Sequence, residues 1–282
     1  MNDDEIRRIL SRAAQLQEQK AQQERSAAAA LPQSSGAGDS DDASSGMDLE
    51  ILKEAAAEVG IHSEDILIAA AEQKSSRHKP IRERLLKRAE LALGSNQRVM
   101  RFAFQVKARP EDTPGIIRRA SEAKPYLLTL ESTFGDDLTV DGVMVFRTVG
   151  YENADAFIGT NNFVLRMLTL DVKKLFFTVR PAEGNVQLSN VVMVAPLDYS
   201  LSLNYKVDTG LSLSLGGIAL VLGGLLLPFP PLAAWAAGAG MAGAGSWLTR
   251  VAYRASYRRS LRKGREAMED LINAIRTEAM TI

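Results

Sequence analysis

The sequence predicts an α+β protein with N-terminal helices, a central antiparallel sheet domain that carries a helix, a C-terminal transmembrane helical hairpin and an amphipathic tail helix. Three observations predict this class. Helical periodicity with capping residues fills the first part of the chain, alternation typical of strands begins near Arg98, and an apolar block without ionisable side chains runs from Leu211 to Leu248. The predicted segments are 1–25, 26–46, 47–94, 95–209, 210–249 and 250–282.

The first segment predicts an amphipathic helix, EIRRILSRAAQLQEQKAQQER. Its apolar stripe comprises Ile6, Ile9, Leu10, Ala13 and Leu16. A helix of this length is marginal in water when isolated, and the segment that follows, 26–46, has the polar, glycine- and serine-rich composition of a disordered linker. The helix is therefore either a mobile docking element or an element packed on a neighbour.

Residues 47–94 predict a helical module. A first helix begins at Asp48 and stops at Gly60, and Ser63 caps a second helix. The pair resembles a helix-turn-helix, but its many acidic side chains oppose contact with phosphates, so no nucleic acid partner is expected. The basic stretch from Ser75 to Gly94 is either a solvated helix face or a second contact with acidic headgroups.

The sheet domain is predicted from short alternating runs, with a helix at Thr113 to Lys124 and turns at Asp141-Gly142 and at 182–185. Residues Asn161 to Asp171 fit a strand or a helix. The candidate strands are RVMRFAFQVKA, YLLTLESTF, DLTV, VMVFRTV, KKLFFTV, VQLSNVVMVA and YSLSLNYKV. Phe102, Phe104, Phe134, Phe146, Phe157, Phe163, Phe176 and Phe177 are expected in the core, with an apolar ligand cavity as the alternative.

The apolar block predicts a membrane hairpin, because the prolines at 228, 230 and 231 split it into two arms. Each arm is near the lower limit of roughly 17 to 25 residues that a hydrocarbon core of about 30 Å requires. Trp235 and Trp247 are candidate interfacial anchors. A shallow hairpin, a strand that invades the first arm, and a buried soluble hairpin are alternatives. Small residues that permit close helix packing, within the hairpin or in a homo-oligomer, are Gly216, Gly223, Gly238 and Ala242.

The exit of the second arm is strongly basic. Candidate lipid-contacting residues there are Arg250, Arg254, Arg258, Arg259, Arg262 and Lys263. Dense positive charge stays on the cytoplasmic side, and the N-terminus carries no export signal. The sequence therefore predicts the bacterial inner membrane with both termini cytoplasmic, and anionic leaflet lipids as partners.

Little in the chain indicates chemistry. It has 282 residues, equal numbers of basic and acidic side chains (34 each), two histidines and no cysteine. Gly238 to Gly243 fits GxGxxG but lies inside an apolar arm and not after a strand, which excludes a dinucleotide site. The paired acids Asp136-Asp137 and Glu111-Asp112 lie in turns, where such residues bind backbone groups. No catalytic residue, cofactor or metal is expected.

Three segments carry a resemblance: EIRRILSRAAQLQ, LEILKEAAAEVGI and YRRSLRKGREAMEDLINAI, the last preceded by the glycine-rich hairpin. Together they resemble uncharacterised bacterial membrane-anchored proteins that have a helical module at the front and an anchor at the back. The resemblance covers roughly half of the chain and implies no activity.

The sequence therefore favours a membrane-anchored cytoplasmic scaffold, adaptor or sensor-type protein without catalytic activity, whose N-terminal helices bind a protein partner or the chain's own sheet domain. One alternative is a lipid-binding or apolar-ligand-binding domain tethered to the membrane. Another is a small pore-forming or membrane-perturbing oligomer that uses Gly238 and Ala242.

Overall fold

The structure is a computed structural model. It describes residues 3–28, 61–75, 81, 83–135, 137–139, 142–148, 162–182, 184–210 and 231–281. Within the helices, the side chains of residues 3–5, 7, 22–28, 162 and 231–246 lie outside the description. The α+β class with an antiparallel sheet, predicted from the change of periodicity, is confirmed.

Five strands form one antiparallel sheet in the order β1-β5-β4-β3-β2. They are β1 (Val99–Val106), β2 (Thr129–Phe134), β3 (Val143–Arg147), β4 (Lys174–Ala182) and β5 (Asn185–Pro196). The turn predicted at 182–185 joins β4 to β5, and Gly184 takes a positive φ of 76° there, a conformation that glycine adopts without strain. The Asp141-Gly142 turn falls partly outside the described residues.

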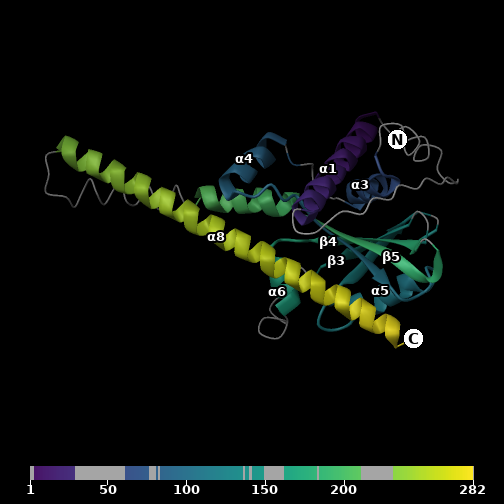
Figure 1. Cartoon of the computed structure of the whole chain (residues 1–282). Coiled ribbons are helices and arrows are strands. Elements are labelled where there is room, and N and C mark those ends of the chain that lie inside the picture. The colour runs from purple at the N-terminus through teal and green to yellow at the C-terminus, as the bar shows by residue number, and fades with distance from the viewer. Residues whose placement is uncertain are drawn as a thin grey trace.

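Helices cover both faces of the sheet (Figure 1). On one face lie α1 (Asp3–Ala28) and α3 (Ser63–Ser75). On the other lie α5 (Thr113–Glu122), α6 (Asn162–Thr169) and the C-terminal half of α8 (Pro231–Met280), while α4 (Glu83–Leu93) packs on α8. The first four residues of β3 are all buried, since their side chains alternate between two covered faces.

The N-terminal helix is packed on its own chain. Ile9, Ala13 and Leu16 are buried against α3 and against sheet residues such as Val99. Arg12 adds ion pairs, 2.9 Å from Glu72 on α3 and 2.8 Å from Asp198. Of the two interpretations of this helix, the structure thus shows an element packed on a neighbour.

The prediction that YSLSLNYKV is a strand is wrong, because residues 198–210 are helical. The buried stripe of this helix follows helical spacing, through Ser200, Leu201 and Asp208, whereas the apolar Leu203 and Val207 are exposed. Polar residues on the buried side shifted the hydropathy pattern toward a period of two. DLTV is also not a strand at residues 137–139, which form a turn. Residues 162–169 resolve the ambiguous segment as helix α6.

The phenylalanines pack as core residues. Phe146 and Phe177 meet edge to face at 5.4 Å between ring centroids on the α8 side, and Phe176 is buried on the α1 and α3 side. Phe104 and Phe163 are also buried, while Phe157 lies outside the described residues. The aromatic residues therefore fill the two interfaces between sheet and helices.

Helix α8 is continuous over 50 residues, or about 75 Å at 1.5 Å per residue. It begins at Pro231, where a fixed φ favours a helix start, and crosses the predicted boundary at 249/250 without a break. Among the helices that the structure describes, none has both the length and the apolar character of a membrane span. Alanine and glycine dominate the N-terminal part of α8 and carry little apolar surface. The second arm is helical, but the transmembrane hairpin is not confirmed, and its first arm lies outside the described residues.

Gly264 allows α8 to approach the sheet domain. A Cβ atom at this position would lie 2.0 Å from Cδ1 of the fully buried Leu170. We expect Gly264→Ala to lower the free energy of unfolding by about 1–3 kcal/mol through overpacking. In the open helical position of Gly115 the same change is expected to raise it by about 0.5–1 kcal/mol. Urea unfolding of both variants measures the two effects, and a gain at Gly264 would contradict the close packing.

Candidate functional site: a basic and aromatic collar

The N-terminal third of α8 projects beyond the sheet domain (Figure 1). From Pro231 to Trp247 this part spans about 24 Å at 1.5 Å per residue. Where it joins the body, large apolar side chains are exposed: Trp247 (64%), Leu248 (59%) and Val251 on α8, and Leu91 (77%) on α4. Exposed apolar residues in this number at one place indicate a contact surface.

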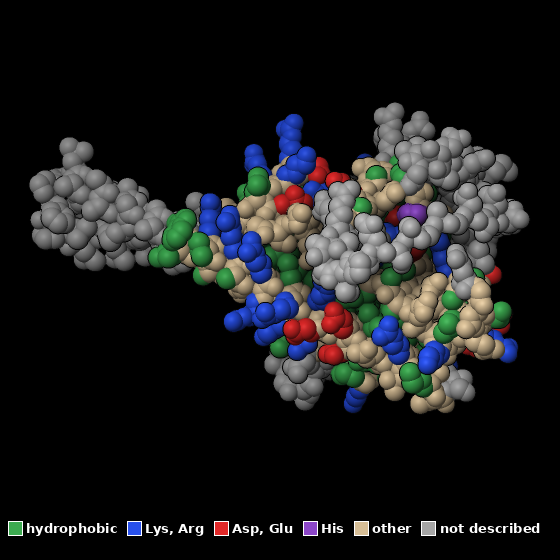
Figure 2. Space-filling view, in the orientation of Figure 1, with side chains coloured by type: hydrophobic (Ala, Val, Ile, Leu, Met, Phe, Trp, Pro, Cys, Tyr) green, Lys and Arg blue, Asp and Glu red, His purple; other side chains and the backbone are tan. Residues whose placement is uncertain are grey.

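Basic side chains follow these apolar residues along α8, from Arg250 beside them to Lys263, about 24 Å beyond Trp247 at 1.5 Å per residue. Figure 2 shows Lys and Arg side chains gathered over α4 and over the part of α8 that leaves the body. We define the basic collar as the exposed residues Arg84, Lys87, Arg88, Arg250, Arg259, Arg262 and Lys263. The first α8 residue of the collar, Arg250, lies about one helical turn from the exposed Trp247. Arginine and tryptophan both favour the boundary between lipid headgroups and hydrocarbon.

Helix α4 presents positive charge because its two acidic residues, Glu83 and Glu90, are paired with Arg98. Arg98, which is buried, bonds through its guanidinium to Glu83 at 2.8 Å and to Glu90. The hydrogen bond from Arg98 lowers the pKa of Glu83 below its ordinary value. With both carboxylates engaged by Arg98, the exposed face of α4 keeps the charges of Arg84, Lys87 and Arg88.

Two of the predicted lipid-contacting residues bind α4. Arg254 donates to the carbonyl oxygens of Leu91 and Ala92, and Arg258 donates to that of Gly94 at 2.9 Å. The last carbonyls of a helix have no partner within it and carry partial negative charge, so a guanidinium satisfies both needs. Arg254 and Arg258 therefore join α4 to α8, and the collar's outward charge comes from the other residues.

A polar seam joins α8 to the helix at residues 198–210 just below the collar. The hydroxyl of Tyr253 donates to the side-chain oxygen of Asn204 at 2.8 Å, and the Asn204 amide donates to the Ser200 carbonyl. Burial, together with the charge of Asp208, raises the pKa of Tyr253. Burial also raises the pKa of Tyr257 to about 12, so both phenols stay neutral at physiological pH. The seam fixes the base of the projecting helix.

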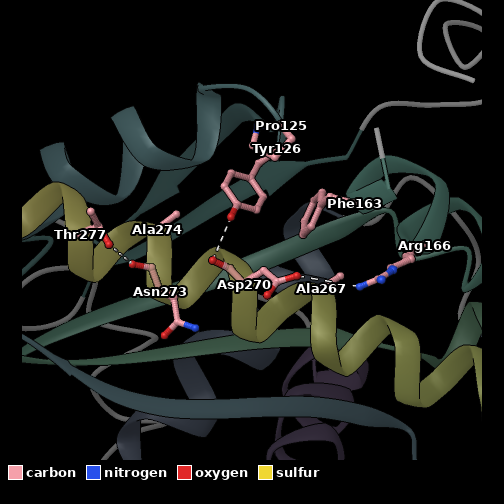
Figure 3. A pocket seen from close by; sticks show the side chains of 9 residues that line it. All are labelled: Pro125, Tyr126, Phe163, Arg166, Ala267, Asp270, Asn273, Ala274 and Thr277. Carbon is pink, nitrogen blue, oxygen red and sulfur yellow. Dashed lines mark hydrogen bonds and ion pairs between the residues drawn. The ribbon is translucent and has the colours of Figure 1, made fainter. Parts of the chain in front are cut away.

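An open groove of about 540 Å³ lies between α6 and α8 (Figure 3). The Tyr126 hydroxyl donates to the carbonyl of Asp270 at 2.9 Å, and Arg166 approaches the Asp270 carboxylate at 3.9 Å. Ala267 and Ala274 also line the groove. These side chains form no arrangement of nucleophile and base, and no group of described residues has the composition of a metal site.

The remaining predicted residues are placed in part. The predicted basic residues that do not bind α4 belong to the collar, and Trp247 is exposed about one helical turn before Arg250. Trp235, Gly238 and Ala242 lie on the helical backbone of α8, which also shows that the GxGxxG match is helix and not a phosphate-binding turn. Gly216 and Gly223 lie outside the described residues.

Comparison with known proteins gives no match, since no protein-family model, no curated protein and no solved structure is similar to this chain. Function is therefore argued from the collar and from the surfaces of the sheet domain.

Proposed function

We propose that this protein is a membrane-anchored cytoplasmic scaffold or adaptor without catalytic activity, held at the anionic leaflet of the bacterial inner membrane by the basic collar. The observation that carries the proposal is the exposed apolar group around Trp247, which lies beside Arg250 on the projecting helix that also carries Arg259, Arg262 and Lys263. A tryptophan next to arginines suits the headgroup level of a bilayer. Each basic residue near an anionic surface contributes about 1 kcal/mol of attraction.

In this proposal, residues 211–248 insert as the hairpin predicted from the sequence, and both termini stay in the cytoplasm. The continuity of α8 supports the arrangement, because a helix that packs on the sheet domain through Leu271 and Ile275 also carries the collar. Movement between anchor and domain would require bending this helix. The protein would thus hold its sheet domain at a fixed distance from the membrane.

The test separates hairpin from collar. The full chain is compared with a shortened chain in which a Gly-Ser linker replaces residues 211–246. The linker is short because Asn204 and Tyr253 hold the flanking helices side by side. We expect the full chain to resist carbonate extraction from membranes. The shortened chain is expected to be extracted, yet to float with vesicles of phosphatidylcholine and phosphatidylglycerol and not with phosphatidylcholine alone.

Substituting alanine for Arg259, Arg262 and Lys263 in the shortened chain is expected to lower its partition onto anionic vesicles about 100-fold, from about 1 kcal/mol per charge. A matched control replaces Lys107, Arg118 and Lys124, three exposed basic residues outside the collar, with the same change in net charge. An equal loss in both variants would show general electrostatic attraction. Equal binding to neutral and anionic vesicles would contradict the role of the collar.

A further inference from the structure

An adaptor needs a surface that binds a partner. The apolar stripe of α1 is already buried on its own domain, so the edges of the sheet are the next candidates. β1 and β2 form the two edges. β2 has a bulge between Leu130 and Ser132, and its Glu131 pairs with Lys174 at 2.7 Å. Bulges and charges of this kind protect an edge from further pairing. β1 pairs with β5 in continuous register over eight residues, without a bulge or a proline.

The outer backbone groups of β1 can be assigned. The carbonyl of Arg98 accepts from Leu197 on the β5 side, whereas the carbonyls of Val99 and Gln105 accept from the side chains of Gln97 and Arg276. In an antiparallel ladder the direction of the backbone groups alternates with each residue, so odd-numbered residues point outward. Among the described residues, side-chain donors therefore reach both ends of the outer edge, and Arg101 and Ala103 between them offer their backbone groups.

A groove of about 410 Å³ runs along this edge, between β1 and α8, and its charged lining on α8 consists of Arg265, Arg276 and Glu269. The guanidinium of Arg265 lies 5.6 Å from the ring centre of Phe102, and that of Arg276 lies 5.8 Å from the ring centre of Phe104. Both arginines are exposed. The guanidinium of Arg265 also pairs with Glu269 on the same helix at 3.5 Å, an exposed pair of the kind that contributes little and that a second carboxylate can replace. Phe102 and Phe104 are two residues apart on one face of β1, so each guanidinium lies near one of two successive side chains of that face.

We propose that the outer edge of β1 binds an extended acidic segment of a partner protein, which adds to the sheet as a sixth strand. Its carboxylates, two residues apart, pair with Arg265 and Arg276, and its backbone bonds to Arg101 and Ala103. Main-chain hydrogen bonds supply affinity and the arginines select acidic sequences, as in other cases of strand addition. The proposal deepens the adaptor function and rests on it, since it names the surface and the class of partner.

The experiment uses the full chain in detergent and a fluorescent peptide, Thr-Val-Glu-Val-Glu-Val-Thr. We expect saturable binding that is lost when lysine replaces glutamate or when alternate amides of the peptide are methylated. Ala103→Pro removes an outward N–H that β5 does not use, so the sheet is expected to persist while peptide affinity falls at least 10-fold. Replacing Arg265 and Arg276 with glutamate should reverse the preference toward the lysine peptide.

Circular dichroism and flotation with anionic vesicles show whether each variant is folded and still anchored. Peptide binding that is absent, or unchanged by Ala103→Pro, overturns the proposal, and retained flotation would leave the anchor function standing. Loss of flotation with retained peptide binding would reject the anchor and keep the edge. If the full chain self-associates through this edge and Ala103→Pro makes it monomeric, the occupant is a second copy, which also overturns an acidic partner.

Discussion

Replacing Arg101 with methionine is expected to lower the free energy of unfolding by about 3–5 kcal/mol, because it leaves buried carboxylates without their cation. Arg101 extends from β1 to the first turn of α3, where its guanidinium bonds to Glu64 at 2.9 Å and to Asp65. The Asp65 side chain has no exposed surface, and one of its oxygens already lacks a hydrogen bond. Urea unfolding of the full chain in detergent, followed by circular dichroism, measures the loss.

Arg118→Met is the matched control. Arg118 pairs with Glu122 four residues away on the exposed surface of α5, at 3.0 Å, and such pairs contribute about 0.3–0.5 kcal/mol. Adding Glu64→Gln and Asp65→Leu to Arg101→Met should recover most of the stability, since the buried negative charges leave together with the positive one. Equal small losses from Arg101→Met and Arg118→Met would show that the α3 carboxylates reach water.

The sheet was predictable because its strands carry local signals. Alternating apolar residues and the turn before Asn185 indicate β4 and β5, and the structure confirms both. The sequence also indicates that helices cover both faces of the sheet, although this signal was not used. Val143 to Phe146 is a continuous apolar run, and each of these residues is buried. The helix at 198–210 escaped prediction because its buried stripe contains Ser200 and Asp208, which hydropathy patterns read as exposed.

The collar was predictable in composition and not in detail. The density of arginine near residue 250 is visible in the sequence, and the structure shows that Trp247 and Arg250 are exposed. The binding of Arg254 and Arg258 to α4 could not be predicted, because backbone carbonyls carry no sequence signature. The burial of two acidic residues in the helical module could not be predicted either, because their partner lies far away in the sequence. The acidic residues of this module were considered only as a barrier to phosphate contact, yet Glu64 and Asp65 are buried against Arg101.

The second large effect is expected at Arg12, which holds α1 on the domain. The loss of unfolding free energy on replacing this residue is expected to depend on pH. Arg12 bonds to both oxygens of Glu72, at 2.9 and 3.1 Å, and to Asp198 at 2.8 Å. Burial opposes the charge of Arg12, but the two carboxylates raise its pKa above the ordinary value. Arg12→Leu should therefore cost about 3 kcal/mol near neutral pH, because a cation that balances two carboxylates is removed. Arg8→Leu, at an exposed position of the same helix, is the control.

The loss from Arg12→Leu should shrink as the pH falls. Burial raises the pKa of Asp198 from 3.8 to about 6, although Arg12 acts in the opposite direction. Because the folded chain binds this proton more tightly than the unfolded chain, Asp198 adds stability as the pH falls from about 6 to about 4 and removes it as the pH rises. Without Arg12 the pKa of Asp198 rises further, so protonation relieves more of the burial cost.

We expect the loss of unfolding free energy caused by Arg12→Leu to be roughly 1 kcal/mol smaller at about pH 5 than at about pH 8, from about 1.4 kcal/mol per pKa unit. Urea unfolding at the two pH values, with hydrogen exchange of the α1 amides, measures the difference. A loss that is independent of pH would show that Arg12 stabilises α1 through Glu72 alone.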